Sequence, residues 1–156
     1  MGSAPLPPCA EHDTPLSSES DGRPGHDADR PFLSILIVAY NSAALIADCI
    51  ASIAPACLRQ GFEVLLVDNG DGSTETLVAR QFPEVRIVPS RGNIGFAAGN
   101  NLLARHAQGD YLLLLNPDMI LNEGAIDALF EGASAHPDAV AWGGVTVDRN
   151  GQPDTG

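Results

Sequence analysis

The sequence predicts an α/β fold, a doubly wound and mostly parallel sheet of about five strands flanked by helices. Short apolar runs without polar alternation recur along the chain, as expected of strands that are buried on both faces. Segments of helical length separate these runs, and such an alternation of strand and helix indicates parallel units with right-handed crossovers. Most of the runs end at turns rich in Asn and Asp, which places polar side chains along one edge of the sheet.

The elements alternate from a first strand to a fifth. Strands are predicted at 33–40, 62–67, 85–88, 111–115 and 139–147. Helices are predicted at 43–54, 74–82, 94–107 and from about 125 to 135. Proline or glycine closes each helix, because proline cannot continue a helix and glycine suits its C-terminal end. The run 111–115 is unbroken and apolar, so we expect that strand to be buried on both faces.

The composition changes abruptly near residue 31. Residues 1–30 are rich in Pro, Ser, Gly and acidic residues and contain almost no large apolar ones, which predicts a disordered acidic tail. Residues 31–156 have the length and the apolar content of one domain. We therefore expect a single folded unit that follows a tail without chemistry of its own.

The charge and the cysteines exclude several classes of protein. The net charge is −12, with 20 acidic residues against 8 basic ones, all arginine, which argues against nucleic acid as a partner. The three cysteines, Cys9, Cys49 and Cys57, lack the spacing of a disulfide framework or a zinc site. Neither a membrane-spanning run nor a signal peptide is visible, so we expect a soluble, cytoplasmic protein.

Polar residues follow three of the predicted strands. Tyr40 and Asn41 follow the first strand, Asp68 and Asn69 follow the second, and the turn 116–118 follows the fourth. An isolated Asn-Pro-Asp is typical of a simple turn. Because the carboxyl ends of parallel strands share one edge, however, the three ends are expected to converge, and ligands bind at that edge. The convergence favours a ligand site.

The residue types at these ends suit a nucleotide and a divalent cation. A lone carboxylate such as Asp118 fits Mg²⁺, which takes few protein oxygens and keeps substrate phosphates as ligands. An Asp or Asn after the second strand can bind a base edge or a ribose hydroxyl, and Tyr40 can flank the base. No G-x-G-x-x-G follows the first strand, the chain lacks the lysine of a P-loop, and there is no G-x-S-x-G elbow.

Four segments of the chain resemble the family 2 glycosyltransferases of the GT-A fold. They read SILIVAYN at 34–41, EVLLVDN at 63–69, GNIGFAAGNN at 92–101 and LLLNPD at 113–118. The resemblance extends from about residue 31 to residue 147. It is greatest to the rhamnosyltransferase-like branch, which acts on cell-surface polysaccharides.

The resemblance implies roles for ten residues. Asp118 would bind the divalent metal, Mg or Mn, and Asn116 stands at the first position of the family's DxD-type motif, which leaves one carboxylate ligand. Nucleotide-sugar binding would involve Ala39, Tyr40, Asn41, Asp68, Asn69, Asn93, Gly95, Asn100 and Asn116. Glycine at position 95 would let the backbone come close to the ligand.

The resemblance also implies a reaction. A sugar would move from a nucleotide-diphosphate donor to a polysaccharide or lipid-linked acceptor, with metal assistance and inversion. The general base would lie in an acceptor-binding half, and neither Asp148 nor Asp154 is identified as that base. The chain therefore resembles a donor-binding portion that is incomplete at its C-terminus. A lipid-linked acceptor would be compatible with peripheral association with a membrane.

Two other functions remain open from the sequence. One is a non-catalytic domain that binds a nucleotide or a partner protein, because no general base or acceptor half is identified. The other is a methyltransferase-like Rossmann domain, in which the acid after the second strand would hold a ribose. The absence of a glycine loop after the first strand argues against this second alternative.

Overall fold

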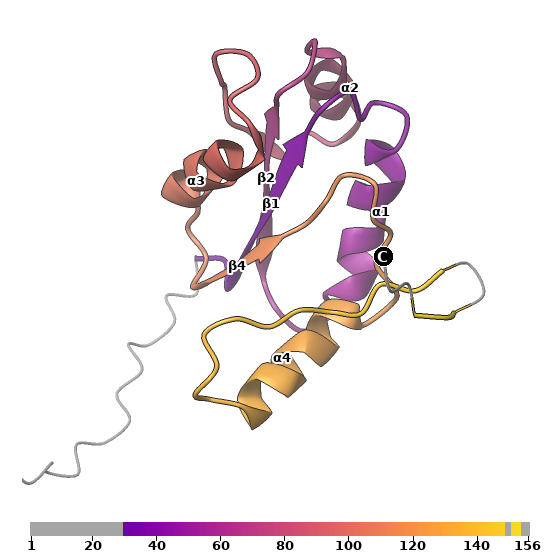
Figure 1. Ribbon diagram of the computed structural model, residues 1–156, viewed down its shortest axis with the longest axis vertical. Helices are drawn as coiled ribbons and strands as arrows, with labels where there is room; N and C mark the ends of the chain where they lie inside the picture. Colours follow the sequence, from indigo (N-terminus) through magenta and orange to yellow (C-terminus); the bar gives the residue numbers. More distant parts are fainter. Residues whose placement is uncertain (1–29, 149–150, 154–156) are drawn as a thin grey trace, which may run out of the picture.

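The protein is an open parallel sheet with helices on both faces (Figure 1). The structure is a computed structural model that describes residues 30–148 and 151–153, so the predicted acidic tail lies outside the described residues except for Arg30. The strands are β1 Leu33–Ala39, β2 Phe62–Asp68, β3 Arg86–Ile87 and β4 Tyr111–Leu114. The helices are α1 Ile46–Ala56, α2 Ser73–Gln81, α3 Phe96–His106 and α4 Ala125–Ala135. The strand order is β3-β2-β1-β4 and every pairing is parallel, which confirms the doubly wound α/β class.

Strand β1 is the centre of the molecule and is buried along its whole length. Ile35 and Ile37 face a core that also contains residues of α1, α2 and α4. Leu36 and Val38 point to the other face, where Leu103 of α3 covers them. The two-sided burial expected from an unbroken apolar run is thus confirmed for this strand, because helices cover both of its faces.

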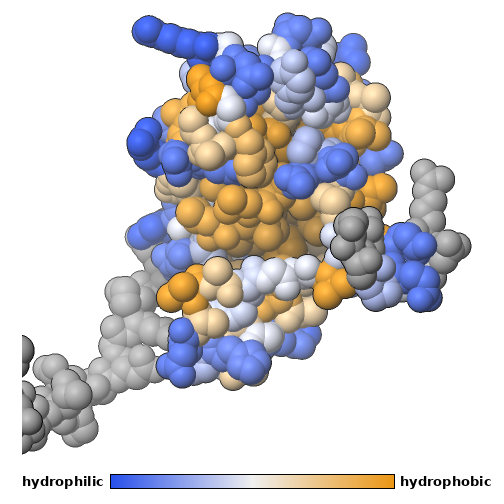
Figure 2. Space-filling view, in the orientation of Figure 1, coloured by the Kyte–Doolittle hydropathy of each residue, from blue (hydrophilic) through white to orange (hydrophobic). Residues whose placement is uncertain are grey.

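Strand β4 differs from the prediction because it lies at the edge of the described sheet. It pairs only with β1, and its side chains are largely exposed, with Leu114 at 54%. Figure 2 shows the resulting apolar area in the middle of the view, where Figure 1 places β4. The expectation that this run is buried on both faces is wrong here. An apolar run records what a strand could bury, whereas burial depends on which elements lie beside it.

The predicted fifth strand is not present among the described residues. Residues 139–147 form no regular strand, and only an isolated bridge joins Val147 to Pro153. Val140, within this segment, is 97% exposed. A strand requires a hydrogen-bonded neighbour, and the segment has none in the sheet, which explains why its apolar residues do not form one. The described sheet therefore has four strands instead of about five.

Both ends of α1 differ from the prediction for local reasons. Helix α1 starts at Ile46, later than predicted, because the backbone N–H groups of Leu45 and Ile46 both donate to the Ser42 carbonyl oxygen in a preceding turn. Asn41 and Ser42 are residue types that often cap a helix, but no side chain caps this one. The helix also continues through Pro55 to Ala56, because proline in a last turn disturbs few of the helix hydrogen bonds.

A hydrogen-bond network fixes the connection between α3 and β4 to the start of β1. The Ser34 hydroxyl donates to a Glu63 carboxylate oxygen at 2.7 Å, and the Gln108 N–H donates to the same oxygen at 2.6 Å. The Gly109 N–H donates to Ser34 Oγ at 2.8 Å. This connection therefore sets the register in which β4 enters the sheet. Among the described residues, no helix is both long and apolar enough to cross a bilayer.

Candidate functional site

The turns that follow β1 and β2 are in direct contact. The Asn69 N–H donates to the Ala39 carbonyl oxygen at 2.8 Å, where the two strands end. Gly70 lies so close to Asn41 that a Cβ atom there would stand 2.8 Å from Asn41 Oδ1. Asn41 itself has a φ of 50°, a left-handed conformation that asparagine tolerates better than most residues. The structure thus brings Ala39, Tyr40 and Asn41 together with Asp68 and Asn69, as the sequence predicts.

Asp68 uses its carboxylate inside the protein. One of its oxygens accepts a hydrogen bond from the Gly70 N–H at 2.7 Å and the other accepts one from the Glu75 N–H at 3.0 Å. Glu75 is the third residue of α2, so Asp68 satisfies one of the backbone donors that a helix start leaves without partners. The side chain is 8% exposed. In this conformation Asp68 fixes the turn and the start of α2, and it presents little surface to a ligand.

We expect Asp68→Ala to lower the free energy of unfolding by about 1–3 kcal/mol, because it would leave two partly buried backbone N–H groups without their acceptor. Urea denaturation monitored by circular dichroism would measure the loss. Asp71→Ala is the matched control in the same turn, since Asp71 is exposed and accepts its backbone hydrogen bond from the Ser73 N–H. Equal and small losses in the two variants would contradict the structural role of Asp68.

Asn69 connects the end of β2 to the segment before α3. Its side-chain amide donates to the Gly95 carbonyl oxygen at 3.2 Å and accepts a hydrogen bond from the Ile94 N–H at 3.4 Å. Asn93 Oδ1 in turn accepts the Gly95 N–H at 2.9 Å. Gly95 has φ 82° and ψ 164°, a conformation restricted almost entirely to glycine. Asn69, Asn93 and Gly95 therefore form one structural unit at the carboxyl edge of the sheet.

The first turn of α3 packs against the same edge. A Cβ atom on Gly99 would stand 2.9 Å from a Val38 side-chain carbon, so this glycine allows the helix to lie close to β1. Asn100 is buried and its amide donates to the Phe96 carbonyl oxygen at 3.1 Å, which is a bond within the helix. The Phe96 side chain and that of Tyr40, at 61%, remain exposed. Exposed aromatic rings are thus available at this edge, and Phe96 lies outside the predicted site residues.

The turn after β4 carries a carboxylate without an internal partner. Asp118 is exposed, and it makes no hydrogen bond or ion pair within the part of the chain that the structure describes. Two arginines form ion pairs with other carboxylates: a guanidinium nitrogen of Arg30 lies 4.0 Å from Asp110 Oδ1, and one of Arg59 lies 2.6 Å from Glu131 Oε1. Asn116, at the other end of the turn, is exposed as well. The Asp118 side chain is therefore free to bind a cation.

A cation bound here would need ligands from outside the described chain. No group of three or more His, Cys, Asp or Glu side chains among the described residues could hold a metal ion. An exposed carboxylate oxygen nevertheless fits Mg²⁺ or Mn²⁺, because such ions accept one or two protein carboxylates and complete their shells with water and substrate phosphate. The donor set at Asp118 therefore suits a metal that arrives with a phosphorylated ligand.

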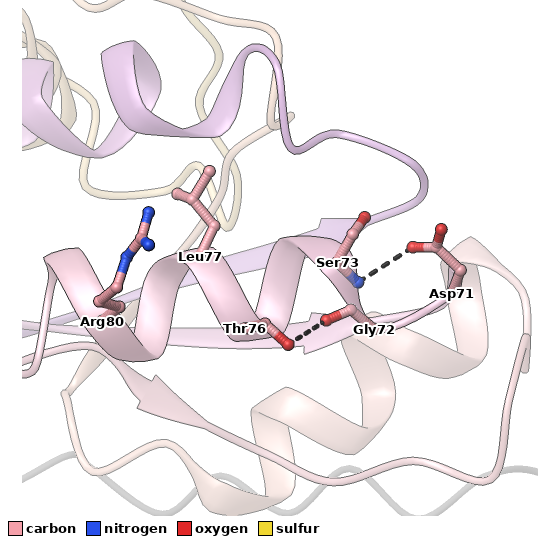
Figure 3. Close-up of a pocket in the computed structure, with 6 residues that line it drawn as sticks. All are labelled: Asp71, Gly72, Ser73, Thr76, Leu77 and Arg80. Atoms are coloured by element: carbon pink, nitrogen blue, oxygen red, sulfur yellow. Dashed lines mark hydrogen bonds between the residues drawn. The ribbon is translucent and has the colours of Figure 1, made fainter.

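A surface hollow lies along α2, away from the predicted residues. It has a volume of about 430 Å³ and is lined by Asp71, Gly72, Ser73, Thr76, Leu77 and Arg80. Figure 3 shows Asp71 and Ser73 at one end of the helix and Arg80 at the other. None of the ten predicted site residues lines it. Four of the ten, namely Ala39, Asp68, Asn69 and Asn100, are buried, whereas the other six are exposed and could be reached by a ligand from outside.

The fold defines a class of protein, namely the open α/β sheets, in which ligands generally bind outside the carboxyl ends of the strands. The family model for glycosyl transferase family 2 matches residues 34–155. The chain belongs to this family.

Curated relatives agree with this assignment. The chain is 33% identical over 132 residues to an N-acetylglucosaminyl-diphospho-decaprenol L-rhamnosyltransferase of Mycobacterium tuberculosis, covering 76% of this chain and 42% of the relative. It is 28% identical over 103 residues to the glycosyltransferase GlyG of Streptococcus pneumoniae, covering 64% of this chain and 34% of the relative. The chain thus spans less than half the length of each of these two relatives.

Solved structures show the same fold. TarS 1-349 of S. aureus in complex with UDP matches with a TM-score of 0.59 and 21% identity, covering 67% of this chain and 32% of that one. The mannosyltransferase PcManGT of Pyrobaculum calidifontis, in complex with GDP-Man and Mn²⁺, matches with a TM-score of 0.56 and 24% identity. The match covers 65% of this chain and 31% of that one. These likenesses confirm the GT-A fold.

Proposed function

We propose that this chain is the donor-binding portion of a glycosyltransferase that moves a sugar from a nucleotide-diphosphate donor to a polysaccharide or lipid-linked acceptor. The observation that carries the proposal is the exposed carboxylate of Asp118, which follows the carboxyl end of β4 and makes no hydrogen bond or ion pair among the described residues. Strands β2 and β4 both run parallel to β1, so the turns that follow the three strands lie at the same edge of the sheet. A nucleotide could then reach all three turns at once.

The nucleotide would lie along the edge made by β1, β2 and α3. The exposed ring of Tyr40 would flank the base. Asn69, through its bonds to Gly95 and Ile94, would fix the part of the site that holds the base. Asn41 and Asn93 offer exposed polar side chains to the ligand. The first N–H groups of α3 follow Gly95, and such groups at a helix start favour phosphate.

Asp118 would hold the divalent metal, and Asn116 would offer a neutral oxygen beside it. When bound, the metal would neutralise the negative charge that develops on the departing nucleoside diphosphate. The side chain is already exposed and unpaired, so binding would break no internal bond. The transfer would proceed with inversion, and the acceptor's general base remains unassigned among these residues.

The related proteins support the classes of donor, acceptor and metal. The name of the Mycobacterium tuberculosis relative describes rhamnosyl transfer to a diphospholipid-linked sugar, which supports a lipid-linked acceptor and peripheral contact with a membrane. One structural neighbour was solved with UDP and the other with GDP-Man and Mn²⁺. UDP is a nucleoside diphosphate and GDP-Man is a sugar linked to one, and the second neighbour contains a divalent ion of the kind proposed here.

Calorimetric titration of the full chain with UDP, GDP and dTDP, each with and without Mn²⁺, tests the proposal. We expect at least one of the three to bind, and to bind more tightly with Mn²⁺ than without it, because the metal links the diphosphate to Asp118. Binding of all three that is indifferent to the metal, or no binding of any, would overturn the proposal.

A further inference from the structure

We infer that one face of α1 positions the metal-binding turn, and that Ser52 and Cys49 on this face are positioning residues for Asp118. The inference rests on the proposed function, because it assigns these two residues a role at the proposed metal site. Neither residue is part of a recognisable motif, and neither touches the expected ligand.

Three contacts spaced three residues apart along α1 carry the inference. The Cys49 thiol donates to the Asn116 carbonyl oxygen with a sulfur–oxygen distance of 3.5 Å. The Leu121 N–H donates to Ser52 Oγ at 3.0 Å, and the Gly124 N–H donates to the Pro55 carbonyl oxygen at 3.1 Å. Residues three apart on a helix share one face. The segment 116–124 is therefore attached to α1 at three successive points, and the two side chains among them lie on one face of the helix.

Ser52 is the central attachment and is itself fixed. Its hydroxyl donates to the Cys49 carbonyl oxygen at 2.7 Å while it accepts the Leu121 N–H. A serine hydroxyl offers one donor, so this hydroxyl has no remaining hydrogen with which to choose another partner. The Cys49 side chain is 1% exposed, so its contact with Asn116 is shielded from water. Both residues therefore present a rigid surface to the turn.

The turn has few other attachments that could fix its position. After Leu115, whose N–H still donates to the Leu36 carbonyl oxygen, the chain leaves the sheet. Among the described residues, one backbone hydrogen bond joins two residues of the segment 116–124. It runs from the Met119 N–H to the Asn116 carbonyl oxygen. Partly buried Met119 and Leu121 pack on the core that includes α1. The location of Asp118 relative to the turns after β1 and β2 thus depends on α1.

Asp118 lies near enough to Cys49 for its negative charge to act on the Cys49 thiol. Burial raises the pKa of Cys49 from its usual range to about 11, and the nearby negative charge of Asp118 acts in the same direction. This agrees with a neutral, structural cysteine beneath a turn that carries a carboxylate.

Ser52→Ala tests the inference by two measurements on the full chain. We expect amide hydrogen exchange in 116–121 to become faster while β1 and β2 are unchanged, because Leu121 loses its acceptor. We also expect the gain in nucleoside diphosphate affinity on adding Mn²⁺ to fall about threefold to tenfold, the effect of one hydrogen bond. Affinity without metal should be unchanged, which a general loss of structure would not produce.

Two further variants serve as controls. Ser52→Thr keeps the hydroxyl and should restore both the exchange rate and the effect of Mn²⁺. Ser134→Ala removes an exposed serine hydroxyl whose one hydrogen bond among the described residues stays within α4, to the Phe130 carbonyl oxygen, and it should change neither. The probe in each case is whichever of UDP, GDP and dTDP the wild-type chain binds most tightly.

The outcomes separate this inference from the proposed function. If Ser52→Ala leaves exchange in 116–121 unchanged, or keeps the full effect of Mn²⁺, the positioning role is overturned and the proposed function stands. If the wild-type chain shows no effect of Mn²⁺, the proposed function fails and the inference fails with it. Faster exchange together with a selective loss of the Mn²⁺ effect supports both.

Discussion

Asp118→Ala is expected to abolish the effect of Mn²⁺ on nucleoside diphosphate binding while the fold is retained. The carboxylate is the only acidic group in the turn 116–118, and it bonds to nothing else among the described residues. Its removal therefore takes away the protein's charged metal ligand without breaking an internal contact. The change in the free energy of unfolding should stay within about 0.5 kcal/mol, as for other surface substitutions. Calorimetry with and without Mn²⁺, together with urea denaturation, would measure the two quantities.

Two variants sharpen this test. Asp118→Asn keeps an oxygen but loses the charge, and we expect it to retain a small part of the Mn²⁺ effect, since divalent ions favour carboxylates over amides. Asp138→Ala removes another exposed carboxylate, beyond α4, and it should leave the Mn²⁺ effect intact. If Asp118→Ala still responds fully to Mn²⁺, the metal must bind elsewhere and the role assigned to this turn is wrong.

The sequence predicted the fold class because the alternation of strands and helices is a local signal. Strand β1 shows this well, since its unbroken apolar run is buried on both faces as expected. Strand β4 has the same type of run, yet its side chains are largely open to solvent because it has a neighbour on one side only. Which strand lies at an edge depends on pairing between distant segments, and no local pattern records it. The same reasoning explains why 139–147 was wrongly expected to be a strand.

The candidate site was predicted at the level of the sheet edge but not at the level of single contacts. The turns after β1 and β2 meet as expected, because parallel strands end together. Whether Asp68 faces a ligand or the start of α2 depends on the turn conformation at Gly70 and Glu75, which the residue types leave undecided. The bonds from Asn69 to Gly95 and Ile94 join residues about 25 positions apart. Contacts of that kind become visible only in three dimensions.

The role of α1 was the least accessible to sequence reasoning. Cys49 and Ser52 look like ordinary members of an amphipathic helix, and the sequence suggested no chemistry for either. Their partners, Asn116 and Leu121, lie 67 and 69 residues further along the chain. A hydroxyl or thiol on the core-facing side of an amphipathic helix indicates that it has a hydrogen-bond partner inside the protein. The identity of that partner follows only from the way β4 returns beside β1.

Gly109→Ala is expected to cause a large loss of stability. A Cβ atom at this position would stand 2.5 Å from the Ser34 nitrogen and 2.7 Å from the Leu33 carbonyl carbon. Both are backbone atoms of the central strand, so they cannot turn aside as a flexible side chain could. We expect the free energy of unfolding to fall by about 3 kcal/mol, the upper end of the usual range for overpacking. Urea denaturation would measure the fall.

Gly144→Ala is the matched control, because Gly144 also lies outside the helices and strands, has no positive φ, and has nothing within 4 Å of its hypothetical Cβ. Its stability should be unchanged or slightly raised, since alanine restricts the unfolded chain more than glycine does. The difference between the two variants isolates the contact of Gly109 with β1 from the general effect of replacing a glycine. If the two variants are equally stable, the connection between α3 and β4 does not lie against Ser34 as described. The position of β4, and with it that of Asp118 at its end, would then need revision.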